Sequence, residues 1–202
     1  MTRVLRVDSL APSREALEQG AAIVRRGGLV AFPTESFYGL GASALDPEAL
    51  ARVFAVKGRS ESRPLLVLVD SVAMAETLVV DVPAGARELM ARHWPGPLTI
   101  VLKAAPGVPE KLTAGTGTLG MRVPGHPVAR GLVRTAGIPV TAPSANPSGS
   151  DPPTTAEEVR RYFERDLDLI LDGGSTAGGT GSTVADCTTW PPRVLRAGPV
   201  IV

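Results

Sequence analysis

Short apolar runs in this chain alternate with loops rich in glycine, proline, serine and threonine, and this pattern restricts the fold more than any other feature. The chain contains 22 glycines and 19 prolines in 202 residues, about a fifth of the sequence, where average usage would give roughly an eighth. Because 44% of the residues are hydrophobic, there is enough apolar material for a core. The pattern therefore predicts many fixed turns between short packed elements, not disorder.

Spacing and cap residues predict six helices. Asp46-Pro47 is typical of a helix start, because Asp caps the first turn and Pro suits the first helical position, and Gly58 ends that helix. Thr155 and Glu158 have the spacing of a capping box. Leu17, Ala21 and Val24 share one face of a helix that ends at Gly27-Gly28, and the other predicted helices cover 46–57, 71–78, 83–93, 126–136 and 155–163.

Eight apolar runs are predicted as strands. They cover residues 29–32, 64–69, 98–103, 119–123, 138–141, 169–171, 183–186 and 194–195. Strands and helices alternate irregularly, which favours an α/β or α+β fold in which flanking helices cover a mixed sheet. No repeat, linker or shift in composition divides the chain, so we expect a single domain over residues 1–202.

Charge and cysteine content exclude several classes of protein. The net charge is +1, which argues against a protein that coats nucleic acid through a strongly basic surface. A single cysteine, Cys187, excludes an internal disulfide and a cysteine-based zinc cluster. No apolar run approaches the roughly 20 residues of a membrane span, and the N-terminus has no apolar signal-peptide core. We therefore expect a cytoplasmic protein without a membrane partner.

Five polar loops lie between the predicted elements, where binding residues are usually found. They cover residues 33–41, 57–64, 104–118, 142–153 and 172–182. Lys57, Arg59 and Arg63 share one loop at the end of a helix. They either complement the helix dipole or form an anion pocket. Arg122 lies in an apolar strand, where an arginine needs either an internal carboxylate or an anionic ligand.

No motif for a nucleophile or an acid–base pair stands out. Ser144 lacks the G-x-S-x-G elbow of hydrolases, and the glycines of 173–181 lack the Walker spacing. The loops instead offer cations, hydroxyls and a glycine backbone that can approach a phosphate closely. This combination indicates a site for a polyanion such as a nucleotide.

Seven of these strings, in this order, resemble the YrdC/TsaC family over about residues 12–198. They are PTESFYGLG, KGRSESRPL, WPGPLT, MRVPGHP, APSANPSG, DGG…GST and LRAG. The resemblance implies an open, twisted mixed α/β sheet with a concave, positively charged face. It implies an L-threonylcarbamoyladenylate synthase of the short type, a nucleotidyltransferase that converts L-threonine, bicarbonate and ATP to L-threonylcarbamoyl-AMP and pyrophosphate. The product would pass to a transferase that modifies the adenosine next to the tRNA anticodon.

The resemblance also implies roles for residues of this chain. Lys57 and Arg59 would face the ATP phosphates and carry the catalysis. Threonine would contact Ser36, Arg122, the backbone of Ala142, and Ser182. The nucleotide would contact Lys57, Arg59, Arg63, Thr118, Ser144, Asn146, Pro152 and Arg196. Mg²⁺ would accompany ATP, and the sequence does not reveal protein ligands for it. Leu68 stands where longer members of the family have a histidine near threonine.

Two other functions remain open on the sequence alone. The same basic face suits an RNA-binding or ribosome-maturation module, although the +1 charge and 4% aromatic content disfavour it, because single-strand binding uses basic grooves with stacking aromatics. Weak RNA binding is compatible with the synthase. A carbamoyl-transfer domain of the hydrogenase-maturation kind belongs to much longer chains with zinc-type cysteines, which this chain lacks.

Overall fold

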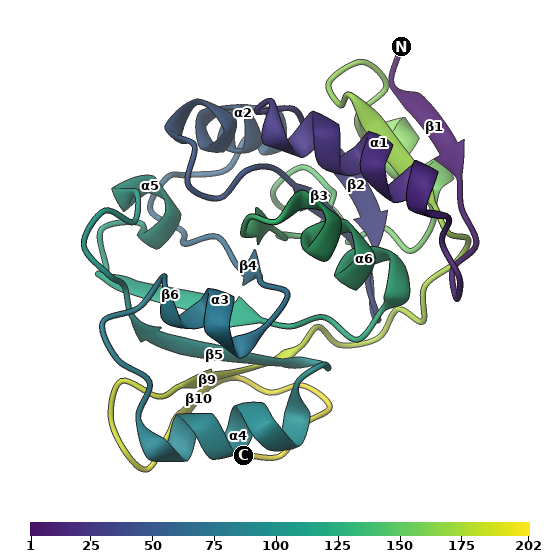
Figure 1. Cartoon of the computed structure of the whole chain (residues 1–202). Coiled ribbons are helices and arrows are strands. Elements are labelled where there is room, and N and C mark those ends of the chain that lie inside the picture. The colour runs from purple at the N-terminus through teal and green to yellow at the C-terminus, as the bar shows by residue number, and fades with distance from the viewer.

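The computed structural model describes all residues, 1–202, as ten strands and seven helices (Figure 1). The strands are β1 (Arg3–Arg6), β2 (Val30–Pro33), β3 (Tyr38–Gly41), β4 (Val67–Leu68), β5 (Leu98–Lys103), β6 (Thr118–Arg122), β7 (Val140–Thr141), β8 (Leu169–Asp172), β9 (Thr183–Asp186) and β10 (Arg193–Arg196). The helices are α1 (Arg14–Arg25), α2 (Pro47–Lys57), α3 (Val72–Glu76), α4 (Ala84–His93), α5 (Glu110–Thr113), α6 (Pro127–Ala136) and α7 (Ala156–Tyr162). The predicted mixed α/β class is confirmed. No helix is long and apolar enough to cross a membrane.

The helix boundaries follow the cap residues of the sequence. The Asp46 carboxylate accepts hydrogen bonds from the first turn of α2, and Gly58 ends that helix at a φ of 54°. The predicted capping box at Thr155 and Glu158 opens α7. The six predicted helices are therefore present, and α5 is an additional short one within the predicted loop 104–118.

The strands differ more from the prediction. The runs 64–69 and 138–141 contribute only the two-residue strands β4 and β7, while β1 was not predicted at all. Strand β3 falls within the predicted polar loop 33–41, because half of its residues are glycine, which strand propensity disfavours. At Gly41 a Cβ atom would lie 2.6 Å from the ring of Phe32 on the paired strand, so the close approach of these strands requires glycine.

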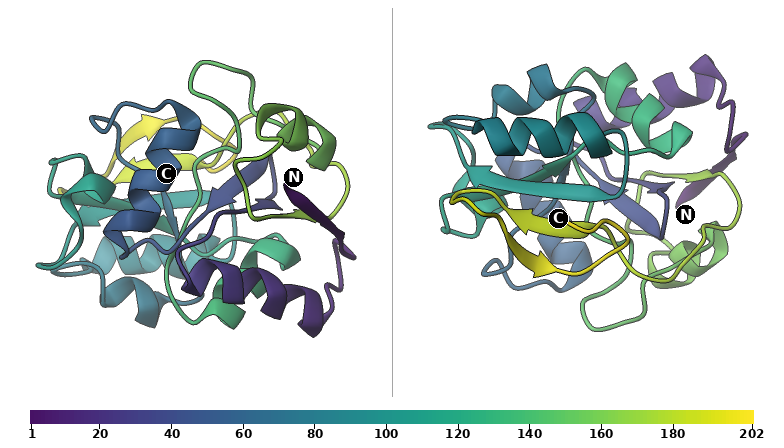
Figure 2. Two further views of the ribbon diagram at one scale, coloured as in Figure 1. Left: turned by 90° about the horizontal axis from the view of Figure 1, so that it is seen from above. Right: turned by 90° about the horizontal axis from the view of Figure 1, so that it is seen from below.

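The strands form two mixed sheets that meet edge to edge. The four-stranded sheet has the order β1-β8-β2-β3, and the six-stranded sheet has the order β10-β9-β5-β6-β4-β7. Isolated bridges between Gly39 and Ser144 and between Ser43 and Val140 connect the β3 edge to the segment around β7. Edge strands β1 and β10 lie at opposite ends of the molecule, as the purple and yellow strands of Figures 1 and 2 show. Of the five polar loops that the sequence predicts as site loops, 33–41, 57–64, 142–153 and 172–182 contribute residues to a pocket at this junction, and 104–118 does not.

Alternation along the strands divides the core into two clusters. In β2, Val30 and Phe32 pack with α1 and α6, whereas Ala31 faces the larger cluster on the other side. In β6, Leu119 and Met121 face the larger cluster. Arg122, one residue further, therefore points to the opposite face of the six-stranded sheet, which leaves it beside the junction of the sheets.

Candidate functional site

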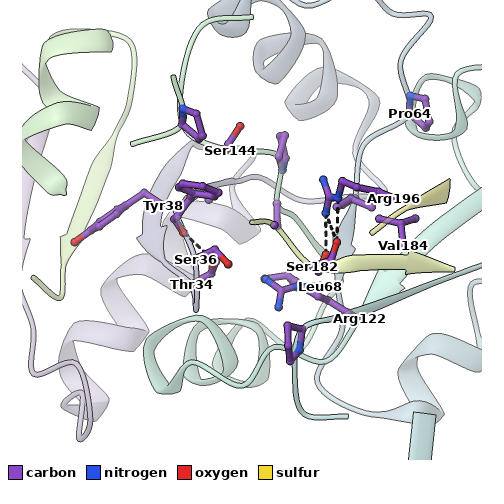
Figure 3. A pocket seen from close by; sticks show the side chains of 18 of the residues that line it. Thr34, Ser36, Tyr38, Pro64, Leu68, Arg122, Ser144, Ser182, Val184 and Arg196 are labelled. Atoms are coloured by element: carbon purple, nitrogen blue, oxygen red, sulfur yellow. Dashed lines mark hydrogen bonds between the residues drawn. The ribbon is translucent and has the colours of Figure 1, made fainter. Parts of the chain in front are cut away.

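A pocket of about 410 Å³ lies where the two sheets meet (Figure 3). Segments far apart in the sequence contribute to its wall. The lining residues are Thr34, Ser36, Phe37, Tyr38, Gly39, Arg59, Pro64, Leu66, Leu68, Pro97, Arg122, Ala142, Pro143, Ser144, Pro152, Gly181, Ser182, Val184, Leu195 and Arg196. The structure thus brings together eight of the twelve predicted site residues, namely Ser36, Arg59, Arg122, Ala142, Ser144, Pro152, Ser182 and Arg196. Leu68, where a departure from longer members was noted, also lies in this wall.

Arg122 satisfies both interpretations that the sequence left open. Its Nη1 donates to Glu35 Oε1 at 2.7 Å, and the same guanidinium lines the pocket. The residue is 8% exposed. A buried arginine of this kind needs a compensating carboxylate, and one such partner leaves the rest of its N–H groups for a ligand.

Arg196 reaches the pocket from β10 and is held against Ser182. Its Nε and Nη2 donate to the Ser182 carbonyl at 2.9 and 2.7 Å. The Ser182 hydroxyl lies 2.8 Å from the hydroxyl of Thr99 in β5. Partial burial and the nearby charge of Arg122 lower the pKa of Arg196. Arg122, Ser182 and Arg196 lie together on one side of the pocket in Figure 3.

Arg59 follows the end of α2 and belongs to the same wall. Its Nη2 donates to the carbonyl of Pro64 at 3.0 Å, which bends the side chain back along its own loop. Burial and, secondly, the charge of Arg63 lower its pKa. Three arginines therefore line one pocket that contains no carboxylate among its lining residues, an arrangement suited to an anion of high charge.

Ser36 lies across the pocket from the arginines, beside Thr34 and Tyr38 (Figure 3). Its hydroxyl donates to the carbonyl of Thr180 at 2.8 Å, and its own carbonyl accepts from the hydroxyl of Thr176 and the N–H of Gly178. These bonds fasten the loop between β8 and β9 over the 33–37 turn. The predicted hydroxyl of Ser36 is thus in the pocket wall, held by a neighbouring loop.

The remaining predicted residues, Lys57, Arg63, Thr118 and Asn146, do not line the pocket. Lys57 is 2% exposed, and its Nζ donates to the backbone carbonyls of Ser144 and Asn146. It therefore holds the 144–146 turn from behind, because it is the donor for carbonyls that would otherwise be unpaired. Burial and the charge of Arg59 lower its pKa to about 8.

Of the other three residues, Asn146 and Thr118 make hydrogen bonds within their own segments, and Arg63 is exposed. The side-chain amide of Asn146 donates to the carbonyls of Pro147 and Ser150, within its own turn. Thr118 pairs with the hydroxyl of Thr116 at 3.0 Å. Arg63 is exposed on the loop after α2. Nucleotide contacts of these residues stay predictions.

Within the string 33–41, the sequence predicts a site role for Ser36 alone. Glu35, the ion-pair partner of Arg122, was overlooked, and so was Tyr38, whose hydroxyl donates to the Gly174 carbonyl at 2.7 Å. Burial and the Asp172 carboxylate raise the pKa of this tyrosine. The signal that could have found Glu35 was the buried Arg122, which required an anionic partner somewhere in the chain.

The structure contains no group of three or more His, Cys, Asp or Glu side chains that could hold a metal ion. The pocket wall offers hydroxyls and carbonyls but no carboxylate, whereas proteins usually hold Mg²⁺ through one or two carboxylates together with substrate phosphates. The residues of the pocket therefore do not fit a protein-held Mg²⁺ ion.

Comparison with known proteins agrees with this geometry. A family model named Sua5_yciO_yrdC, described as telomere recombination, matches residues 22–198. The chain belongs to this family. A Pyrococcus abyssi threonylcarbamoyl-AMP synthase is 44% identical over 92% of this chain and 56% of its own length. A Thiobacillus denitrificans threonylcarbamoyl-AMP synthase is 37% identical over 94% of this chain and its own full length.

The solved structures of the Sua5/YrdC family share the fold. The crystal structure of Pyrococcus abyssi Sua5 complexed with L-threonine has a TM-score of 0.93 and 42% identity, over 96% of this chain and 57% of that one. The chain thus spans little more than half the length of this relative. The resemblance inferred from the seven strings is confirmed at the level of family and fold, and the charge of the concave face stays a prediction.

Proposed function

We propose that this protein is an L-threonylcarbamoyladenylate synthase, which makes L-threonylcarbamoyl-AMP and pyrophosphate from L-threonine, bicarbonate and ATP. In the proposed reaction the threonine amine and bicarbonate form a carbamate and release water. A carbamate oxygen then bonds to the α-phosphorus of ATP, and the bond to pyrophosphate breaks. The enzyme is accordingly a nucleotidyltransferase.

One observation carries this proposal: three arginines from three separate segments, Arg59, Arg122 and Arg196, line a single pocket without a carboxylate in its wall. Both reactants of the proposed step, a carbamate and a triphosphate, are anionic. Their repulsion is the main obstacle to the reaction, and cations fixed in advance reduce it. The relatives described above carry the same activity in their names.

The positions of the side chains support a division of the pocket. Arg122 and Ser182 are proposed to take the threonine carboxylate, with the hydroxyl of Ser36 across the cavity. Arg59, Arg196, Ser144 and Pro152 are proposed to surround the nucleotide. Lys57 acts in this proposal by holding the 144–146 turn against the cavity.

Positioning and neutralisation of charge replace a general base in this mechanism. Once carbamate and α-phosphate are held side by side, the reaction behaves as an intramolecular one, and effective molarity can supply about 7–11 kcal/mol of the barrier. Prolines in the turns around the pocket, among them Pro64, Pro97 and Pro143, suit this role because their fixed φ angles leave less backbone freedom to lose when the substrates bind. Mg²⁺ is proposed to arrive on the phosphate oxygens of ATP.

The proposal extends to the fate of the product. L-Threonylcarbamoyl-AMP is a mixed anhydride of a carbamate and a phosphate, so it is chemically suited to immediate transfer. We propose that it passes to a tRNA threonylcarbamoyl transferase in the cytoplasm. The RNA-binding alternative gains no support from the geometry, because single-strand binding uses exposed stacking aromatics, whereas the aromatic residues of the pocket wall are Phe37, which is half-buried, and Tyr38, which is buried.

Release of pyrophosphate tests the proposed function. Purified protein is incubated with ATP, with L-threonine and bicarbonate added or omitted separately, and pyrophosphate is measured by a coupled assay while the adenylate product is identified by mass spectrometry. We expect release only when all three substrates are present. Equal release without threonine, or tight binding of tRNA without any turnover of ATP, would contradict the proposal.

A further inference from the structure

Glu35 lies behind the wall of the pocket, next in sequence to Ser36 and in contact with Arg122. It is not among the residues that line the cavity. Its Oε1 accepts from Arg122 Nη1 at 2.7 Å and from the backbone N–H of Gly125 at 2.8 Å. The 33–37 turn therefore supplies both a hydroxyl to the cavity and an anchor to the cation opposite it.

The hydrogen bonds of Arg122 leave most of its donors unused by the protein. Nη1 is committed to Glu35 and makes a longer contact of 3.4 Å with the Gly96 carbonyl. Nε and Nη2 donate to no protein atom, and neither is a buried unpaired atom. Because a guanidinium is a planar fork with fixed donor directions, fixing one nitrogen orients the others. Since Arg122 lines the cavity, these free donors face it.

Glu35 is held at one of its two oxygens: Oε1 accepts both hydrogen bonds, and Oε2 is buried without a partner. The Gly125 N–H on its Oε1 comes from the turn that precedes α6, and a Cβ at Gly125 would lie 3.3 Å from the same oxygen. Although burial alone would raise the pKa of Glu35, Arg122 and the backbone N–H groups outweigh it and lower this pKa. The carboxylate is thus ionised at neutral pH, and it compensates the charge of the buried Arg122.

We propose that Glu35 is the positioning residue of this pocket, which fixes the Arg122 guanidinium so that its free N–H groups meet the carboxylate of an amino-acid substrate. This inference rests on the proposed function and adds a determinant of substrate class to it. An anchored fork favours a planar carboxylate, which accepts two parallel N–H bonds. Analogues without a carboxylate leave those donors unpaired and are disfavoured. Glu35 acts through Arg122 and does not touch the nucleotide.

Direct binding measured by calorimetry tests this role without relying on turnover. The ligands are L-threonine, L-threoninol, which has a hydroxymethyl group in place of the carboxylate, and ATP. We expect the wild-type protein to bind L-threonine at least tenfold more tightly than L-threoninol. In Glu35→Ala, the affinity for L-threonine should fall roughly tenfold, the preference over L-threoninol should shrink by the same factor, and the affinity for ATP should change less than about twofold.

Two further variants separate orientation from folding. Glu35→Gln has the same shape and retains one acceptor for Arg122 and Gly125, so we expect it to recover part of the lost preference. Glu18→Gln is the matched control, because Glu18 forms an exposed ion pair with Arg25 on α1, away from the pocket. It should bind all three ligands like the wild type. Circular dichroism establishes that each variant is folded.

The possible outcomes distinguish the inference from the function on which it rests. If the wild-type protein binds no L-threonine, the proposed function fails and the inference with it. If the wild-type binds L-threonine and both Glu35 variants keep its affinity and its preference, Glu35 does not position Arg122. If removal of Glu35 tightens the binding of L-threonine, Glu35 competes with the substrate carboxylate, and the proposal is also wrong. An equal loss for ATP and L-threonine would indicate a merely structural residue.

Discussion

The guanidinium of Arg196 holds Ser182 through both its backbone and its side chain, since it donates to the carbonyl from Nε and Nη2 and to the hydroxyl from Nη2 at 3.0 Å. Arg196 is the last residue of β10, and Ser182 immediately precedes β9. These two strands lie side by side at one end of the six-stranded sheet. The last strand is thereby tied to the wall of the pocket. The position of one cation of the site thus depends on the pairing of an exposed edge strand.

Replacement of a pocket arginine should strongly reduce turnover without unfolding the protein. For Arg59→Ala and Arg196→Ala we expect kcat/KM for ATP to fall at least 100-fold, because each variant removes a charged donor, worth about 1.5–3 kcal/mol, and also a cation that reduces repulsion. The pyrophosphate assay and thermal unfolding measure the two effects. Arg193→Ala is the control, since Arg193 lies on β10 like Arg196 but forms an exposed ion pair with Asp186. Normal activity in both pocket variants would refute the map of the nucleotide site.

Gly198 should tolerate no side chain, although it makes no contact with the cavity. A Cβ there would lie 2.4 Å from the N atom of Thr183 and 2.6 Å from the carbonyl oxygen of Gly181, both fixed backbone atoms. Gly198→Ala must therefore move the chain after β10 and displace Arg196 from Ser182. We expect a loss of stability of about 1–3 kcal/mol in urea unfolding and a loss of activity that approaches that of Arg196→Ala.

The neighbouring residue provides the control for this change. Ala197 is exposed, so Ala197→Ser should leave the free energy of unfolding unchanged and turnover within about twofold of the wild type. If Gly198→Ala is as stable and active as Ala197→Ser, the close packing at Gly198 does not position Arg196.

The sequence predicted elements well where local signals decide them. Asp46, Gly58 and Thr155 mark helix ends by short-range hydrogen bonds, and the structure has those ends in place. The order of the seven strings predicted that Ser36, Arg122 and the APSANPSG turn share one pocket. This prediction came from the family resemblance, because local patterns contain no information on which distant segments meet.

The sequence could not predict the directions of individual side chains or the contacts between residues far apart in the chain. Lys57 stands in a string with Arg59, yet one lies behind the 144–146 turn and the other in the pocket wall. The two residues are only two positions apart near the end of a helix, but their side chains point to different surroundings. The residue types alone do not indicate which of them donates to backbone carbonyls. Likewise, Glu35 and Arg122 are 87 positions apart, so nothing local links them.

Substitution of Asn146 should affect stability more than recognition of the nucleotide. Its amide bridges the carbonyls of Pro147 and Ser150 and so stiffens the turn, while its Oδ1 is buried without a partner. We expect Asn146→Ala to lower the free energy of unfolding by about 1–3 kcal/mol, the cost of unpaired carbonyls, and to change the KM for ATP by less than about threefold. Ser148→Ala, an exposed change in the same turn, is the control. A rise in KM above tenfold at unchanged stability would place Asn146 at the nucleotide instead.

Lys57 should make the stability of the protein depend on pH in the alkaline range. Its pKa falls to about 8 in the folded chain because of burial and the charge of Arg59, whereas an unfolded lysine keeps a pKa of about 10.4. Between these values the unfolded chain binds a proton that the folded chain has released, so stability rises with pH. Relative to Lys57→Met, the wild-type protein should gain about 1.5 kcal/mol between about pH 8 and pH 9.5.

Urea unfolding of both proteins across this range measures the gain as a difference, which cancels the contribution of Cys187, whose pKa burial raises to about 11 in each. Lys57→Met should already be the less stable protein at pH 7, because the carbonyls of Ser144 and Asn146 lose their donor. The gap between the two should then widen as the pH increases. Lys103→Met, which removes an exposed lysine from β5, should show a constant gap. A gap for Lys57→Met that stays constant or narrows would mean that Lys57 remains fully charged behind the 144–146 turn.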